Sequence, residues 1–124
     1  MSHATQQREE IPRPAWHEAL ELLTKEHEGY EATIEIVGEE VGDQEEATTL
    51  PLNSIEYDRK DDVIVVAVGG HSARFPVVLR HIINHPRTIW VHPPGPAPTR
   101  AVWAVDADGV ETLIRLHPRP ALPE

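Results

Sequence analysis

The sequence contains no cysteine, which excludes disulfide bonds, a thiolate nucleophile and a zinc site built on cysteine sulfur. It also lacks the Gly-x-Ser-x-Gly turn that carries the nucleophile of many hydrolases. The longest apolar run, Val63–Val68, is far shorter than a membrane span. Residues 1–10 lack the basic start and apolar stretch of a signal peptide. We therefore expect a cytoplasmic protein that does not enter a membrane.

The sequence is poor in basic residues, and its charge is divided unevenly along the chain. It has 124 residues and a formal net charge of −10 at pH 7. Residues 1–62 contain 17 acidic and 5 basic side chains, a net charge of −12, whereas residues 63–124 contain 4 and 6, a net charge of +2. Neither half has a dense cluster of lysine or arginine, so the protein repels nucleic acids and anionic lipids. We expect neither as a partner.

The first regular element predicted by the hydrophobic pattern is a helix. Trp16, Leu20 and Leu23 recur at helical spacing, which predicts a helix over about residues 14–28. Gly29 follows as a stop, because glycine adopts the positive φ that commonly ends a helix.

The rest of the chain shows the alternation of strands, broken by turn residues. Pro51 is expected to end a strand or to mark a sheet edge. Residues 79–85 fit either the end of a strand or a short helical turn. Asp106-Ala107-Asp108-Gly109 predicts a hairpin turn, with glycine where positive φ is needed. Six or seven strands are predicted, at residues 30–36, 44–50, 55–57, 63–68, 88–92, 101–105 and 110–116. Residues 74–80 also fit a strand, but Pro76 disfavours it.

The number of predicted strands decides the expected fold class. A single flat sheet of this many strands would leave much apolar surface exposed if only one helix covered it. We therefore predict an α+β fold in which the N-terminal helix packs on a strongly bent antiparallel sheet or a small β-barrel. The predicted domain spans residues 12–117, with flexible tails at 1–11 and 118–124. The predicted core contains Trp16, Leu20, Leu23, Ile34, Ile36, Val65 and Leu113.

Short motifs of turn and core residues are spread over about residues 11–116. They are Ile11-Pro12, Trp16, His27-Glu28-Gly29-Tyr30, Thr33-Ile34-Glu35-Ile36-Val37-Gly38, Leu50-Pro51-Leu52, His81-Ile82-Ile83 with Pro86, and Asp108-Gly109 with Thr112-Leu113-Ile114-Arg115. Together they resemble an uncharacterised bacterial family of short acidic proteins, one of the domains of unknown function. The resemblance implies a fold and no activity, and it supplies no catalytic residue.

Four histidines of the second half are candidates for metal binding or catalysis. His81 and His85 are four residues apart, the spacing of two zinc ligands on one helix face, and the third ligand would be His71, His92 or an acid. On a strand the same two side chains would lie about 13 Å apart, too far to share one ion. Because Pro86 ends the segment and no glutamate follows His81, we predict no metal and no other cofactor.

An acidic run follows the first predicted strand and contains Glu39, Glu40, Asp43, Glu45 and Glu46. Its spacing does not match a calcium loop with a closing glutamate. Two other roles stay open. The run can protect a strand edge from aggregation, or it can form a surface that binds a basic protein partner.

Trp90 and Trp103 both lie on predicted strands. On a solvent-exposed sheet face they could stack on a sugar, a base or a peptide. The alternative, which the pattern favours, is that both rings pack in the core.

These observations give three hypotheses for the function. The first is a non-enzymatic protein-binding or accessory module that acts through its acidic surface, with Trp90 and Trp103 as further partner-binding candidates. The second is a small enzyme or metal-binding protein that uses the histidines of the 71–92 stretch. The third is a homo-oligomeric structural protein. Histidines that converge with a carboxylate in one pocket would favour the second.

Overall fold

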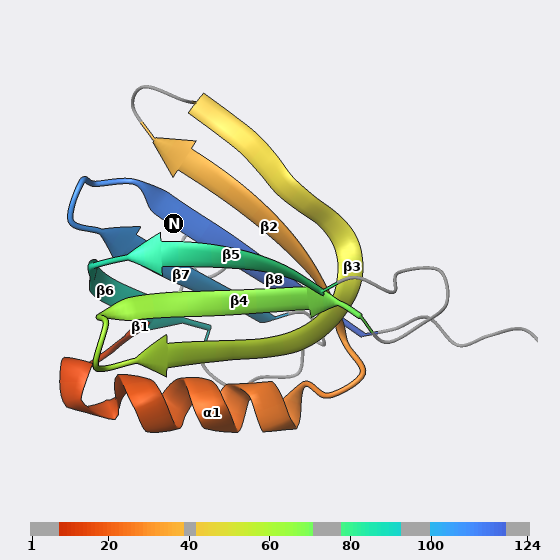
Figure 1. The fold of residues 1–124 in the computed structure, drawn as a ribbon, viewed down its shortest axis with the longest axis horizontal. Coiled ribbons are helices and arrows are strands. Elements are labelled where there is room, and N and C mark those ends of the chain that lie inside the picture. Colours follow the sequence, from red (N-terminus) through yellow and green to blue (C-terminus); the bar gives the residue numbers. More distant parts are fainter. Residues whose placement is uncertain (1–7, 39–41, 71–77, 93–99, 119–124) are drawn as a thin grey trace, which may run out of the picture.

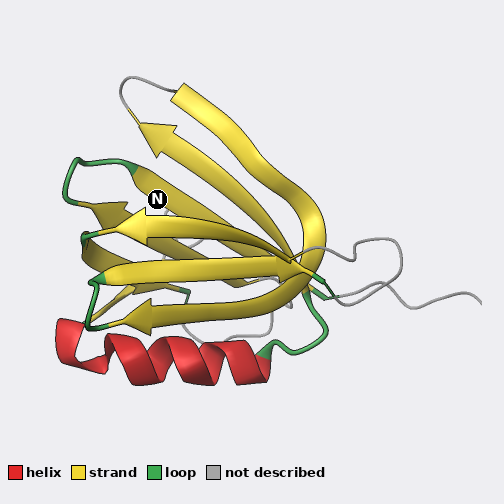
Figure 2. Cartoon of the chain, in the orientation of Figure 1, coloured by secondary structure: helices red, strands yellow, loops and turns green. Residues whose placement is uncertain are grey.

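One α-helix and eight strands make up the part of the chain that the structure describes (Figure 1; Figure 2). The structure is a computed structural model that describes residues 8–38, 42–70, 78–92 and 100–118, with the backbone alone for residues 38 and 42–49. In chain order the elements are β1 (Glu9–Ile11), the 3-10 helix η2 (Arg13–Ala15), α1 (Trp16–Glu26), β2 (Glu31–Gly38), β3 (Gly42–Asp58), β4 (Val63–Gly69), β5 (Val78–Asn84), β6 (Pro86–Val91), β7 (Arg100–Asp106) and β8 (Glu111–His117).

All eight strands belong to one antiparallel sheet with the order β1-β6-β7-β8-β2-β3-β4-β5. The sheet is strongly bent at β3, whose first half pairs with β2 and whose second half pairs with β4. As a result β4 and β5 lie in front of β6 and β7 (Figure 1). The predicted bent sheet with one N-terminal helix is therefore confirmed.

The sheet does not close into a barrel, so that alternative of the prediction is wrong. Within the described residues β1 and β5 are the two end strands, and each pairs with a single neighbour. The helix α1 lies beside the second half of β3 instead of another strand (Figure 2). A helix in this position covers the core without completing a ring of strands.

Side chains of α1 bond to the edge of β3 that β2 leaves free. Thr24 Oγ1 accepts from the Ile55 amide at 3.0 Å, and its one hydroxyl hydrogen is shared between the carbonyl oxygens of Leu20 at 2.9 Å and Ile55 at 3.0 Å. His17 Nδ1 lies 3.2 Å from the carbonyl oxygen of Tyr57. These contacts satisfy backbone groups that a neighbouring strand would otherwise pair. No helix in the described part of the chain is long and apolar enough to cross a membrane.

The core lies between the two layers of the sheet and under α1. The predicted core residues Trp16, Leu20, Leu23 and Ile34 are buried there. The prediction is wrong for Val65 and Leu113, which are half-buried and lie on strand positions that alternate with buried ones. Ile36 is also only half-buried. The buried set is Trp16, Leu20, Leu23, Ala32, Ile34, Leu52, Ile55, Tyr57, Ile64, Val66, Val68, Ile83, Ile89, Val102, Ala104, Ile114 and Leu116.

Several strand predictions need correction. Pro51 does not end a strand, because β3 continues through it. Proline has no N–H to donate, and Pro51 lies where β3 leaves β2 and begins to pair with β4. Residues 78–84 form a strand, which decides between the two alternatives left open for that segment. The predicted hairpin after β7 is present, with Gly109 at φ 83°.

The first residues described also differ from the prediction. Residues 9–11, expected in a flexible tail, form β1 and pair with β6. Ile11 packs against the core, and its carbonyl oxygen accepts a hydrogen bond of 2.8 Å from Trp16 Nε1. This bond fixes the end of β1 to the start of the helix.

Candidate functional site

A cluster of polar side chains surrounds Asp62, in the turn between β3 and β4. Tyr57 donates its hydroxyl hydrogen to Asp62 Oδ1 at 2.7 Å. His85, in the corner between β5 and β6, donates from Nδ1 to Asp62 Oδ2 at 3.2 Å, because a carboxylate only accepts. Arg13 completes the cluster, with Nη1 3.5 Å from Asp62 Oδ1 and Nη2 donating to the Pro86 carbonyl oxygen at 3.0 Å. The carboxylate therefore connects the helix start and the β5–β6 corner to the β3–β4 turn.

The backbone at this cluster is unusual as well. Asp62 has φ 56° and His85 has φ 51°, a conformation that L-residues adopt infrequently outside Asn, Asp and His. The two residues are also joined through their backbones, since the His85 amide donates to the Asp62 carbonyl oxygen at 2.9 Å. The surrounding bonds hold both residues in this conformation.

The bonds at Asp62 change the acidity of two groups. The hydrogen bond from Tyr57 is the main cause that holds the pKa of Asp62 below its usual value, and bonds from His85 and Arg13 act in the same direction. Burial raises the pKa of Tyr57 above its usual value, and the Asp62 carboxylate raises it further. At neutral pH Asp62 is therefore charged and Tyr57 keeps its proton.

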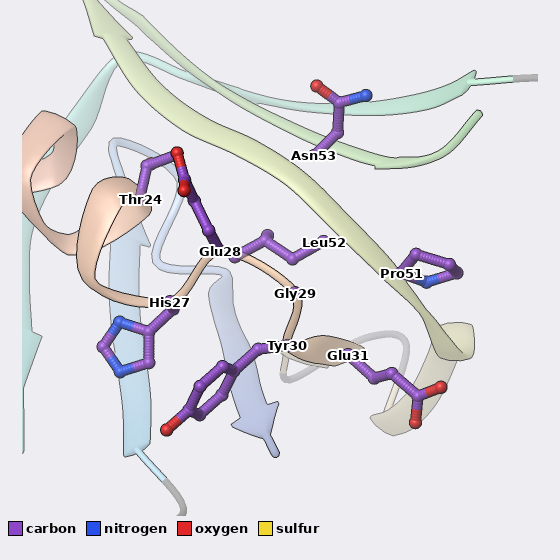
Figure 3. Close-up of a pocket in the computed structure, with 9 residues that line it drawn as sticks. All are labelled: Thr24, His27, Glu28, Gly29, Tyr30, Glu31, Pro51, Leu52 and Asn53. Carbon is purple, nitrogen blue, oxygen red and sulfur yellow. The ribbon is translucent and has the colours of Figure 1, made fainter. Parts of the chain in front are cut away.

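In the described part of the chain, one cavity lies between the end of α1 and β3 (Figure 3). It has a volume of about 390 Å³. The buried His27 donates from Nδ1 to the Leu23 carbonyl oxygen at 2.8 Å, and its ring meets the edge of the Tyr30 ring with centroids 4.7 Å apart. Figure 3 shows these two rings on one side of the cavity and Asn53, from β3, on the other. The lining is Thr24, His27, Glu28, Gly29, Tyr30, Glu31, Pro51, Leu52 and Asn53.

The second cavity, of about 480 Å³, lies beside the start of α1 and carries both signs of charge. Neither cavity is lined by Asp62 or His85. Within the described residues no three His, Asp or Glu side chains converge in a way that could hold a metal ion. The second cavity is lined by His17, Glu21, Glu56, Tyr57, Asp58, Arg59, Lys60 and Val65.

Trp90 and Trp103 lie on the outer face of the sheet, opposite the core. They are direct cross-strand partners on β6 and β7. Each is next in sequence to a buried core residue, Ile89 or Val102. Since successive side chains of a strand point to opposite faces, the tryptophans point outward. Both are half-buried, and the expectation that they belong to the core is wrong.

The two tryptophans are the centre of a row that crosses five strands. Strand register places Glu10 of β1 beside Trp90, Leu113 of β8 beside Trp103, and Glu35 of β2 beside Leu113. We call these five residues the tryptophan row. Its middle is apolar and each end carries a carboxylate.

A guanidinium group already lies against this row. Arg8 Cζ is 4.3 Å from the ring centroid of Trp90 and 5.2 Å from that of Trp103, within the range of cation–π attraction. Arg8 Nη1 is also 3.6 Å from Glu111 Oε2. His92 meets the edge of Trp103 with centroids 4.9 Å apart. Burial, and then the charge of Arg100, lower the pKa of His92, so its ring is neutral at pH 7.

The histidines proposed from sequence do not form one site in the described residues. His81 lies on β5, His85 binds Asp62 and His92 lies against Trp103. His71 lies outside the described residues. Of the acidic run, Glu39 and Glu40 lie outside the described residues, while 43–46 belong to β3 and only their backbone is described.

Sequence reasoning missed Asp62, Tyr57, Arg13 and Arg8. Arg13 and Asp62 are 49 residues apart, and His85 and Asp62 are 23 apart, so no local motif connects them. The alternation of Ile89 with Trp90 was the one available signal for the tryptophan row, and it does not say which face is buried.

Comparison with known proteins gives the chain a family. The model of the family of unknown function DUF5335 matches residues 7–124. The chain belongs to this family. A protein described as uncharacterized, from Aquifex aeolicus (strain VF5), is 32% identical over 114 residues, which cover 92% of this chain and 96% of that protein. No solved structure matches the chain. The resemblance to a domain of unknown function is thus confirmed, and membership in DUF5335 assigns no activity.

Proposed function

We propose that this protein is a non-enzymatic binding module that holds a basic segment of a partner protein on its tryptophan row. The observation that carries the proposal is the pair of outward-facing rings, Trp90 and Trp103, with a guanidinium group against them. Tryptophan faces attract cations, and adjacent aromatic rings supply a large rigid contact area.

The charges around the row favour a basic partner. Glu10 and Glu35 stand at its ends, and Glu111 lies close enough to contact the cation over the rings. The net charge of −10 attracts basic segments from a distance. Arg115, with Nη2 3.5 Å from Glu35 Oε1, offsets the charge at one end of the row. Glu10 neighbours Trp90 by strand register, and Glu111 contacts the guanidinium group that lies over the rings.

The Asp62 cluster supports catalysis less well than the row supports binding. Its carboxylate is already bonded to Tyr57, His85 and Arg13, and neither described cavity opens onto it. The cluster connects the helix start, the β3–β4 turn and the β5–β6 corner. This arrangement suits a group that stabilises the fold.

The experiment is a titration with a short capped peptide whose arginines are separated by glycine and serine, followed by calorimetry. We expect Trp90→Leu and Trp103→Leu each to weaken binding about three- to tenfold, as the loss of a cation–π contact predicts. Ile82→Ala, at a 50% exposed apolar residue on β5, is the matched control and should bind as the wild type does. Trp103→Phe, which keeps an aromatic ring, should bind with intermediate affinity.

Binding should also weaken as sodium chloride rises from about 50 mM to about 500 mM, because salt screens the carboxylates around the row. A peptide with glutamate in place of arginine should not bind. If the arginine peptide bound equally to the wild type and to both tryptophan variants, the row would not be the binding surface.

A further inference from the structure

We infer that the tryptophan row is selective for arginine and that Arg8 is an internal ligand which occupies it until a partner arginine takes its place. This inference rests on the proposed function. It specifies that the recognised group is a guanidinium, and it adds that Arg8 of the same chain competes with the partner for the row.

The contacts of Arg8 combine two aromatic faces with a carboxylate, both of which attract a guanidinium group. The group lies over two indole rings, at 4.3 Å and 5.2 Å from their centroids, and its Nη1 is 3.6 Å from Glu111. A planar, delocalised cation can stack on a ring and bond to a carboxylate in its own plane. A lysine ammonium is a compact and strongly hydrated charge, so it uses only part of this arrangement.

The segment that carries Arg8 is held weakly. β1 has three residues and pairs with β6 alone, at one end of the sheet (Figure 1). Glu9 and Glu10 are exposed. The firm anchor is Ile11, which packs on the core and accepts the hydrogen bond from Trp16. Opening from Arg8 as far as Glu10 therefore breaks few contacts and leaves the helix in place.

That opening would uncover two things at once. It frees the outward faces of Trp90 and Trp103, and it frees the edge of β6 that β1 covers. An extended partner segment could then place an arginine over the rings and pair with the β6 edge, as β1 does. Because Arg8 must leave first, the apparent affinity is lowered by the fraction of molecules in which the site is open.

The test compares Arg8→Ala and Arg8→Lys with the wild type, using the arginine peptide and the same peptide with lysine. The readout is the three indole N–H signals in an NMR titration, in which the buried Trp16 serves as the internal reference. We expect Arg8→Ala to bind the arginine peptide about three- to tenfold more tightly than the wild type, since the competitor is gone. Arg8→Lys should fall between them, and the lysine peptide should bind every form more weakly.

The outcomes separate this inference from the proposed function. Suppose that Arg8→Ala binds the arginine peptide no more tightly than the wild type, while the tryptophan variants still lose binding. The proposed binding function would then be supported, and the proposed competition by Arg8 would be wrong. If the lysine peptide binds as well as the arginine peptide, the selectivity is wrong. If neither Trp90 nor Trp103 responds to the peptide in any form, the proposed function itself is wrong.

Discussion

The Asp62 carboxylate bonds to three other parts of the chain at once. It lies in a turn, yet it bonds to the segment before the helix, to the end of β3 and to the corner before β6. Hydrogen bonds to a charged group contribute more than neutral ones, and a bonded partner left unsatisfied adds a further cost. The carboxylate is 35% exposed, so water moderates both effects.

We predict that Asp62→Asn destabilises the protein by about 1–2 kcal/mol at pH 7. The folded pKa of Asp62 lies below its unfolded value, so the charged group contributes stability above the unfolded pKa of about 3.9. That contribution is lost as the pH falls through the lower, folded pKa. Urea unfolding of the wild type and of Asp62→Asn between pH 7 and pH 2 should show that the difference between their free energies of unfolding becomes smaller as the pH falls. A difference that stays constant with pH would contradict the assignment.

Tyr57→Phe provides the companion measurement. Burial, and then the bond to Asp62, raise the folded pKa of Tyr57, so the protonated hydroxyl contributes stability below the unfolded pKa of about 10, and this contribution is lost as the pH rises through the folded value. We expect the free energy of unfolding of the variant to be about 0.5–1.5 kcal/mol lower than that of the wild type at pH 7. The variant should also lack the fall in stability that ionisation of Tyr57 causes at alkaline pH. Combined with Asp62→Asn, the two losses should be less than additive, because one change removes the donor of this bond and the other removes the charge of its acceptor.

At the scale of elements, α1 covers the edge of β3 where a further strand would otherwise pair. Its apolar side covers the core through Trp16, Leu20 and Leu23, while Thr24 bonds to the edge of β3. This dual contact covers the edge of the second half of β3 that pairs with no strand, although the sheet does not close.

We predict that Thr24→Val, which keeps the shape and removes the hydroxyl, costs about 1–3 kcal/mol, because the Ile55 amide loses its acceptor. Thr24→Ser keeps the hydroxyl and is the control. Hydrogen exchange of the Ile55 amide should speed up in Thr24→Val alone. If the Ile55 amide exchanged at the same rate in the wild type and both variants, Thr24 would not be its hydrogen-bond acceptor.

The packing of α1 can be tested with two neighbouring leucines. Leu23 is 5% exposed and Leu22 is 56% exposed. We predict that Leu23→Ala lowers the free energy of unfolding by about 2–5 kcal/mol, because it leaves a cavity under the helix. Leu22→Ala removes the same atoms from the surface and should change stability by less than about 0.5 kcal/mol. Losses of equal size would show that the helix does not pack as described.

For the whole molecule, the division of charge along the chain is only partly a division in space. Arg115 of the second half contacts Glu35 of the first half, and Arg8 of the first half contacts Glu111 of the second. The face that carries the tryptophan row therefore mixes both signs. We therefore expect the acidic excess of residues 1–62 to act on the proposed basic partner mainly through the overall electrostatic field.

We predict that changing Glu39, Glu40, Glu45 and Glu46 together to glutamine slows association with the arginine peptide severalfold at low salt and leaves the dissociation rate nearly unchanged. At high salt the variant and the wild type should associate at similar rates. Stopped-flow tryptophan fluorescence measures both rates. Equal association rates at low salt would show that the acidic run does not steer the partner.

The sequence by itself determined the elements whose signals are local. The helical spacing of Trp16, Leu20 and Leu23 and the stop at Gly29 predicted α1, and Asp106 to Gly109 predicted the last hairpin. Hydrogen bonds within a helix or across a tight turn join residues close in sequence, so their patterns can be read without knowing the fold.

Only the tertiary structure decided the features that depend on contacts between residues far apart in sequence. β1 exists because β6 offers it an edge, and β3 runs through Pro51 because it changes partners there. Both faces of β6 and β7 carry apolar residues, so alternation alone could not show that Ile89 faces inward and Trp90 outward. The face of β6 and β7 that carries Ile89 is buried because the other layer of the sheet and α1 pack against it. The tryptophan row therefore lies on the outer face of the sheet.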